Sequence, residues 1–149
     1  MKNLQLRKAT AENSEFTYQT EKSAFREYVE KVRGWDEDRE QQFHLKCFAS
    51  QDFQIIQVSG VDVGFLSLTR QPDFIKVHKL FISPKHQSKG FGEAVMKLLI
   101  EEASALKLPV RLQVLKVNSR AFAFYQRLGF KRTSENDTHV LMERLSESA

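Results

Sequence analysis

Cysteine is nearly absent from this chain, since Cys47 is the only one among 149 residues. One cysteine excludes an internal disulfide and a cysteine-based metal site, because both need more than one thiol. Long apolar runs are absent too, and none approaches the roughly 18 residues that a membrane-spanning helix needs. The opening residues, Met1 to Arg7, alternate like a strand and lack the apolar stretch of a signal peptide. We therefore expect a soluble cytoplasmic protein with no bound metal.

Repeats, low-complexity segments and linkers are also missing. A chain of 149 residues is long enough to bury about two thirds of its unfolded surface. Hydrophobic residues make up 41% of the sequence and include twelve Phe, which supports a packed core. We expect a single domain that spans residues 1–149.

The excess of one charge sign is modest, at a formal net charge of +4. Basic residues are spread along the chain and interleaved with acids, as on solvated faces, so the charge alone does not favour nucleic acid as a partner. Basic residues gather around Lys85, His86, Lys89 and Arg120. A positive potential there suits a ligand rich in phosphate.

Hydrophobic periodicity predicts strands that alternate with helices and end in a hairpin. The expected strands begin at Leu4 to Leu6 and continue with 53–58, 61–69, 74–83, 110–117, 130–134 and 138–145. The expected helices are 12–32, 36–50, 90–107 and 118–129. The second helix should turn Phe43, Cys47 and Phe48 inward, and the third should bury Val95, Leu98, Leu99, Ala103 and Leu106. This order predicts an α/β fold, a mixed sheet with helices on both faces.

The segment Gln87 to Gly92 lies between an expected strand and an expected helix. Its glycines, Gly90 and Gly92, allow positive φ angles and let amide groups converge where the helix begins. Helix amides and the cation of Lys89 favour a phosphate at such a turn. The alternative is a tight connection without a ligand. A dinucleotide-binding fingerprint is excluded, because its third glycine would fall at Val95.

A second motif covers Asn118 to Phe130. Asn118 or Ser119 can cap a helix whose apolar stripe contains Tyr125, and Gly129 suits the left-handed position that ends it. The glycine turn and this asparagine-led helix follow each other in an order and spacing that resemble the GNAT superfamily of acetyl-CoA-dependent N-acetyltransferases.

The resemblance implies the GNAT fold: a mixed, mostly antiparallel sheet of about seven strands, flanked by about four helices and splayed between strands four and five. It also implies an enzyme that moves an acetyl group from acetyl-CoA to a primary amine of a small molecule or protein, by direct attack in a ternary complex. The implied partners are acetyl-CoA and an amine acceptor, with no nucleic acid and no membrane, in a monomer or homodimer. The alternative is a non-catalytic acyl-CoA-binding module.

By position, the resemblance assigns cofactor contacts to strand four and to the glycine turn. Strand four would pair its backbone with the pantetheine arm, and the turn would hold the pyrophosphate. Asn118 and Ala121 of the expected helix 118–129 would also contact the cofactor. A helix cap without any cofactor contact is the alternative role of Asn118. The residues are Leu80, Phe81 and Ile82 on the strand, and Gln87, Ser88, Lys89, Gly90, Phe91, Gly92 and Glu93 in the turn.

Tyr125 matches the family's tyrosine that faces the thioester sulfur, where a neutral phenol can protonate the leaving thiolate. The base is less defined, because Gln113 stands where some branches have a glutamate. His78 matches the strand-four base of other branches, and strand alternation predicts that it shares a face with Lys76, Leu80 and Ile82. Alternatively, His78 is a hydrogen-bonded strand histidine that takes no part in the chemistry. In a further alternative, the amine loses its proton to solvent, in which case no protein base is needed.

The acceptor is expected where the first two helices meet strand four and the final hairpin. An aromatic side chain beside carboxylates can hold an ammonium group. Alternatively, the acids cap the second helix while Trp35 packs beneath it. The candidates are Tyr28, Trp35, Asp36, Glu37, Asp137, Thr138 and His139. The runs 34–37 and 111–118 resemble a group of small bacterial GNAT proteins whose acceptors are not established.

Overall fold

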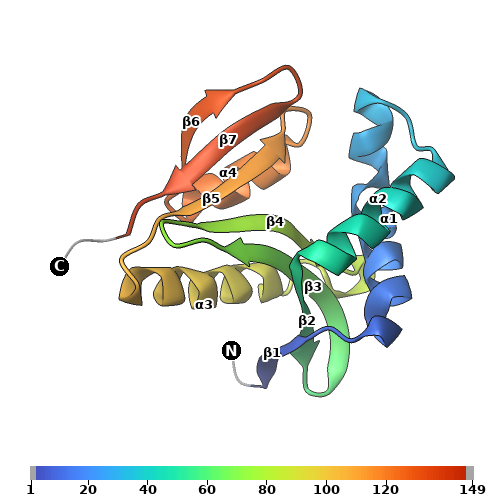
Figure 1. Cartoon of the computed structure of the whole chain (residues 1–149), viewed down its shortest axis with the longest axis horizontal. Coiled ribbons are helices and arrows are strands. Elements are labelled where there is room, and N and C mark those ends of the chain that lie inside the picture. Colours follow the sequence, from blue (N-terminus) through green and yellow to red (C-terminus); the bar gives the residue numbers. More distant parts are fainter. Residues whose placement is uncertain (1–2, 147–149) are drawn as a thin grey trace.

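A seven-stranded sheet, in the order β1-β2-β3-β4-β5-β7-β6, organises the computed structural model, which describes residues 3–146 (Figure 1). Neighbouring strands are antiparallel, except that β4 and β5 are parallel. The predicted mixed, mostly antiparallel sheet is therefore confirmed. The strands are β1 (Leu4–Lys8), β2 (Asp52–Val58), β3 (Val61–Arg70), β4 (Ile75–Ile82), β5 (Val110–Leu115), β6 (Lys131–Glu135) and β7 (His139–Arg144).

The four predicted helices are present, with ends shifted by a few residues. They are α1 (Ser14–Val32), α2 (Glu37–Ser50), α3 (Phe91–Ala105) and α4 (Ser119–Arg127), and single 3₁₀ turns, η1 (Ala11–Asn13) and η2 (Pro84–His86), precede α1 and α3. Gly34 separates α1 from α2 at a φ of +75°, which costs glycine little. Asp36 then caps α2 by accepting a hydrogen bond from the Arg39 amide at 3.0 Å.

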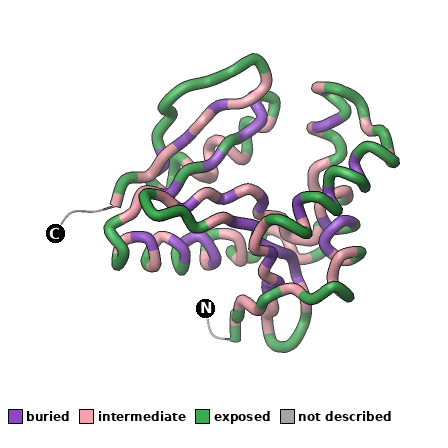
Figure 2. The backbone as a smooth tube through the Cα atoms, in the orientation of Figure 1, coloured by how far each residue is buried: buried purple, intermediate pink, exposed green. Residues whose placement is uncertain are grey.

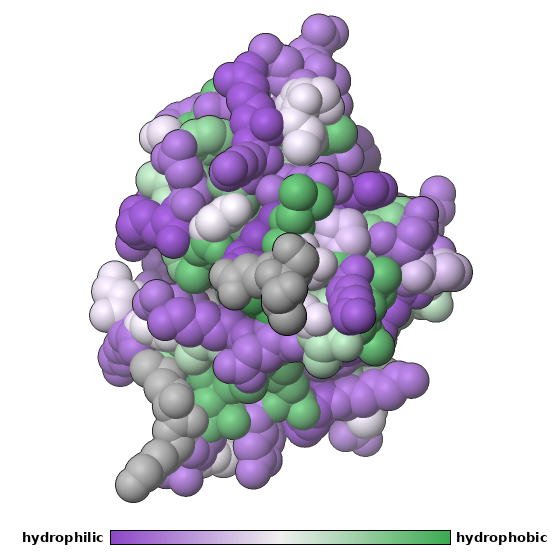
Figure 3. Space-filling view, turned by 90° about the vertical axis from the view of Figure 1, so that its left-hand side faces the viewer, coloured by the Kyte–Doolittle hydropathy of each residue, from purple (hydrophilic) through white to green (hydrophobic). Residues whose placement is uncertain are grey.

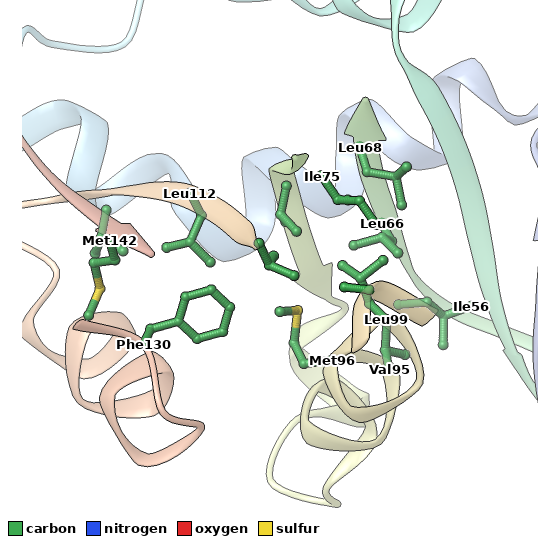
Figure 4. Close-up of a cluster of buried hydrophobic side chains, with 14 of the residues drawn as sticks. Ile56, Leu66, Leu68, Ile75, Val95, Met96, Leu99, Leu112, Phe130 and Met142 are labelled. Atoms are coloured by element: carbon green, nitrogen blue, oxygen red, sulfur yellow. The ribbon is translucent and has the colours of Figure 1, made fainter. Parts of the chain in front are cut away.

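Helices cover both faces of the sheet, as the order of elements predicts. On one face, α3 and α4 pack against the larger core cluster, in which Phe130 lies among Leu112, Met96 and Met142 (Figure 4). On the other face, α1 and α2 cover a smaller cluster, where the rings of Phe53 and Phe65 stack at 5.3 Å. Figure 2 shows the buried residues concentrated in the central strands and on the inner side of α3.

Two helices turn different side chains inward from those predicted. In α3, Met96 is fully buried, whereas Leu98 is 45% exposed and Leu106 is 56% exposed. The buried arc runs from Val95 through Leu99 to Met96, and at about 100° per residue Leu98 lies about 110° from its centre. Leu106 lies beyond the last helical residue.

In α2, the predicted inward position of Phe43 is wrong, because that side chain is 55% exposed. Cys47 is buried as predicted and Phe48 is half-buried. The other inner positions belong to Glu40 and His44, which are buried polar residues. Polar groups at helical spacing on an inner face need partners, and these lie near the cavity described below.

The surface seen from the left-hand side of Figure 1 is mostly hydrophilic, with hydrophobic side chains in patches that hydrophilic ones interrupt (Figure 3). Within residues 3–146, no helix combines the length and the apolarity needed to cross a membrane.

The orientation of α3 can be tested with adjacent leucines. Leu99→Ala should lower the free energy of unfolding by about 2–5 kcal/mol, because it removes packed atoms and leaves a cavity. Leu98→Ala should cost less than about 1 kcal/mol, because its side chain already meets solvent. Urea unfolding followed by circular dichroism measures both. Equal losses would contradict this orientation.

Candidate functional site: a cavity where two strands part

β4 and β5 pair over only two register positions, Ile75 with Val110 and Lys76 with Arg111. Beyond them the strands separate, as the predicted splay requires, and a cavity of about 540 Å³ opens between them. Helices α1 and α2 close one side of this cavity, and α4 contributes to the other. Its lining includes Glu21, Phe25, Arg33, Arg39, Glu40, Phe43, Lys76 to Phe81, Gln113 to Leu115, Asn118, Ala121, Tyr125 and His139.

A β-bulge interrupts β4 at His78. Ser67 of β3 pairs with Lys79, whereas Leu68 pairs with Val77, so His78 has no partner in the register. An extra residue shifts the alternation of side chains by one position. Residues that pack in the α3-side cluster are therefore odd-numbered before the bulge and even-numbered after it: Ile75, Val77, Leu80 and Ile82.

The bulge corrects the predicted orientation of His78. Its Nε2 lies 2.7 Å from the hydroxyl of Thr69, which pairs with Lys76 in the register. His78 therefore lies on the side of Lys76, as predicted, but not on that of Leu80 and Ile82, which pack in the α3-side cluster. Alternation along the sequence contains no sign of the inserted residue.

His78 also lines the cavity. Burial lowers its pKa below the usual value, and the positive charges of Lys76 and Lys79 lower the pKa further. The imidazole is therefore neutral at pH 7 and able to accept a proton. The hydrogen bond to Thr69 and the place in the cavity lining are both observed, and the role of His78 as base stays a prediction.

Tyr125 and Asn118 bring α4 to the same cavity. Tyr125 packs edge-on against Phe124 and Phe130, at ring-centroid distances of 5.0 and 5.6 Å. Burial raises the pKa of Tyr125 well above its usual value, so the phenol keeps its proton. Asn118 caps α4, because its side-chain oxygen accepts a hydrogen bond from the Ala121 amide at 3.1 Å. Asn118 and Ala121 both line the cavity.

The turn before α3 presents backbone amides. Gly90 has a φ of +81°, and the second left-handed residue is Ser88, at +64°, rather than Gly92, which lies in the first turn of α3. The Ala94 amide makes an i to i−4 hydrogen bond to the Gly90 carbonyl at 3.1 Å. The amides of the three preceding residues therefore have no acceptor within the helix.

Gly92 lies beside side chains of β4 and α4. A Cβ added there would meet Phe124 Cζ at 3.7 Å and Leu80 Cδ2 at 3.9 Å, which is ordinary van der Waals contact. Gln87 supports the start of the turn by donating from Nε2 to the Ile82 carbonyl at 2.9 Å. The exposed Lys89 adds positive charge to the turn. These features suit an anion at the N-terminus of α3.

The predicted acceptor residues near α2 have structural partners. Glu37 accepts hydrogen bonds from Tyr18 at 3.0 Å and from Trp35 at 2.8 Å, and pairs with Lys22 at 2.9 Å. The hydrogen bond from Lys22, followed by that from Trp35, lowers the pKa of Glu37 to about 2. Asp36 caps α2, so the capping alternative describes these acids.

Among the predicted acceptor residues, His139 lines the cavity. The structure does not bring the others to the lining: Trp35 and Asp36 precede α2 and Glu37 is its first residue, Tyr28 packs on Phe25, and Asp137 and Thr138 lie in the turn between β6 and β7. Their acceptor role stays a prediction.

Two groups of ion pairs lie in the cavity lining. Lys79 of β4 is buried, and its Nζ lies 2.7 Å from Oε1 of Glu21 in α1. The same oxygen lies 3.5 Å from Nδ1 of His44, whose Nε2 lies 2.9 Å from the Thr17 hydroxyl. Although burial raises the pKa of Glu21, contacts with His44 and Lys79 outweigh it and lower the pKa overall.

The second group of ion pairs centres on the buried carboxylate of Glu40. Arg33 Nη2 lies 2.8 Å from its Oε1, and Arg39 Nε lies 3.5 Å from its Oε2. Arg39 also donates from Nη2 to the Gly34 carbonyl at 2.8 Å. Both arginine side chains remain nearly half exposed, so they can meet a ligand from the cavity.

Residues 11–130 match the family model described as the acetyltransferase (GNAT) family. The chain belongs to this family. Within the described residues of this GNAT protein, no cluster of three or more His, Cys, Asp or Glu side chains could hold a metal ion.

Similar proteins are N-acetyltransferases by name. An uncharacterized N-acetyltransferase from Methanocaldococcus jannaschii is 28% identical over 118 residues, which are 72% of this chain and 50% of that protein. A spermidine N(1)-acetyltransferase from Thermoplasma acidophilum is 30% identical over 90 residues, 58% of this chain and 54% of that protein. The chain thus spans about half the length of the curated relatives it matches.

Among solved structures, the PaiA N-acetyltransferase from Thermoplasma acidophilum, in complex with coenzyme A, superposes with a TM-score of 0.74 at 19% identity. The match covers 95% of this chain and 98% of that one. It supports the GNAT fold over nearly the whole length.

Sequence reasoning missed the charged residues of the α1–α2 side: Glu21, Arg33, Arg39, Glu40 and Lys79. One signal was available, because Glu40, His44 and Cys47 follow helical spacing with polar groups at buried positions. The pairing of Glu21 with Lys79 could not be inferred, since the two residues are 58 positions apart in sequence.

Proposed function

We propose that this GNAT protein transfers an acetyl group from acetyl-CoA to a primary amine of a small molecule or protein, in a ternary complex with Tyr125 as general acid. The observation that carries the proposal is the cavity at the parting of β4 and β5. Tyr125 lies in its lining, and so does Leu80, whose Cδ2 lies 3.9 Å from where a Cβ on Gly92, in the first turn of α3, would stand.

The residues present fit coenzyme A. The free amides at the start of α3 and the cation of Lys89 would hold the diphosphate. Past Lys76, the edge of β4 that faces β5 has no strand partner. The backbone of Leu80, Phe81 and Ile82 would pair there with the pantetheine arm. Coenzyme A supplies the activated acyl group as a thioester.

The chemistry then needs few side chains. The neutral amine attacks the thioester carbonyl, a backbone amide of β4 would donate to the oxygen that becomes negative, and the carbon–sulfur bond breaks. Tyr125 would give its proton to the departing thiolate, and the nitrogen would lose its proton to His78 or to water. Close positioning of the amine and thioester supplies much of the rate.

Release of free thiol from acetyl-CoA, measured with a panel of primary amines, tests the proposal directly. Amine-dependent release is the expected result. Tight coenzyme A binding by calorimetry together with no acetylation of any amine would favour the non-catalytic acyl-CoA-binding module, which Gln113 in place of an acid also suits.

Tyr125→Phe should lower turnover about 10²-fold or more, because only the proton donor is removed. Coenzyme A affinity should remain nearly unchanged, since the ring still packs on its neighbours. Tyr18→Phe is the control, because Tyr18 lies outside the cavity lining and its hydroxyl donates to Glu37. Assays of thiol release measure turnover, and calorimetry measures the affinity for coenzyme A. Equal turnover in Tyr125→Phe would remove this residue as the acid.

Variants of the two glycines in the turn distinguish an effect on coenzyme A binding from an effect on stability. Gly92→Ala should leave the free energy of unfolding unchanged or raise it by up to about 1 kcal/mol. It should weaken coenzyme A binding about tenfold or more, because the added methyl group lies against Phe124 and Leu80, next to the amides that would hold the diphosphate.

Gly90→Ala is the contrasting variant. Its left-handed φ should cost about 1–2 kcal/mol of stability in any residue with a Cβ. Urea unfolding and calorimetry measure both variants. Full coenzyme A affinity in folded Gly92→Ala would place the diphosphate elsewhere.

His78 gives a pH prediction. A base must be unprotonated, so kcat/KM should rise with pH through the lowered pKa of His78, at a pH below its usual value of about 6.5. His78→Gln should lose this limb of the profile, while Tyr125→Phe should keep it. An identical acid limb in His78→Gln would assign the proton to another acceptor.

A further inference from the structure

The cavity has more positive than negative side chains. Four cationic residues line it, Arg33, Arg39, Lys76 and Lys79, against two carboxylates, Glu21 and Glu40. Two formal positive charges are therefore left over. The two histidines of the lining do not change this sum, because burial and nearby cations lower the pKa of His78 and of His139 and keep both uncharged at pH 7.

Both carboxylates already have cationic partners. Glu21 pairs with Lys79 at 2.7 Å, and Glu40 is shared between Arg33 and Arg39 at 2.8 and 3.5 Å. One carboxylate thus serves two guanidinium groups. Each guanidinium has five N–H donors, and Glu40 and the Gly34 carbonyl occupy only some of them. Donors remain for a second anion.

Lys76 strengthens the positive field. Within residues 3–146 it has no ion-pair partner, and its charge acts on His78 in the same lining. The positive charge of the lining would repel an acceptor with several ammonium groups, because both carboxylates already have partners. The same charge would attract an anionic group.

We propose that the acceptor is a small primary amine that also carries a carboxylate or phosphate, and that Arg33 and Arg39 bind this anionic group. The inference rests on the proposed function and deepens it by naming the substrate class. A cavity of about 540 Å³ suits a small molecule. Its apolar wall, Phe25, Phe43 and Phe81, can cover the carbon chain between amine and anion.

Matched acceptors test the proposal. γ-Aminobutyrate and γ-aminobutyramide differ in one charge, as do phosphoethanolamine and ethanolamine, so the two pairs separate carboxylate from phosphate recognition. At low salt, kcat/KM should be about tenfold or more higher for the anionic member of at least one pair, and higher than for spermidine. Preference for the uncharged members, or for spermidine, would overturn the proposal.

Variants assign the preference to the arginines. Arg33→Gln and Arg39→Gln should each lower the ratio between anionic and uncharged acceptors about tenfold, while acetylation of the uncharged member persists. Arg26→Gln is the matched control, because Arg26 pairs with Glu30 on an exposed part of α1. An unchanged ratio in both cavity variants would contradict the assignment.

A binding measurement keeps this test independent of transfer. Saturation-transfer NMR with γ-aminobutyrate and γ-aminobutyramide, on protein with and without coenzyme A, reports acceptor binding alone. Preferential binding of the anion that is lost in Arg39→Gln supports the substrate class even where no transfer occurs, and equal binding overturns it. Failure of the proposed function would appear separately, as no uptake of coenzyme A by calorimetry.

Discussion

The parting of β4 from β5 after two register pairs is the constraint on which the rest of this molecule depends. Each strand is held firmly on its other side, β4 by β3 and β5 by β7, so the sheet remains continuous while a gap opens at its centre. Backbone groups that face the gap have no ladder partner and must be satisfied by water or by a ligand. A cavity placed at the middle of a sheet can therefore receive an extended ligand along a strand edge without any change in the fold.

The β-bulge at His78 decides which side chains meet this cavity. Without the extra residue, alternation would put Lys79 on the α3 side of the sheet, among apolar residues. With it, Lys79 reaches Glu21 of α1, and His78 bonds to Thr69. One inserted residue thus aims two neighbouring polar side chains at the α1–α2 side. The buried chain from Thr17 through His44 and Glu21 then neutralises Lys79, so the arginines carry the charge that a ligand can use.

The order of elements, the GNAT family and the glycine turn could be predicted from the sequence, because each depends on local patterns of apolar and turn residues. The acceptor side could not be predicted in this way. Trp35 and the acids beside it form a visible motif, yet the partners of Glu37, Tyr18 and Lys22, lie in α1, and the motif lies outside the cavity lining. Of the groups that do line the cavity, Glu21 is held by Lys79, 58 residues away, and Arg33 is held by Glu40 across the connection between α1 and α2. Similarly, periodicity placed Leu98 in a wide stripe, and only the packing of α3 on the sheet shows which edge of that stripe is buried.

The fold brings some of the positive charges of the chain together. A net charge of +4 spread along a sequence indicates solvated faces, but in the folded chain some of the cations meet at two places, the turn before α3 and the α1–α2 side of the cavity. At the turn, backbone amides share the work with Lys89, so that site depends on helix geometry as well as charge. At the cavity, Glu40 holds Arg33 and Arg39 in place, and its single negative charge neutralises only one of their two positive charges. A second anion would therefore find two oriented guanidinium groups, which need little further ordering to bind it.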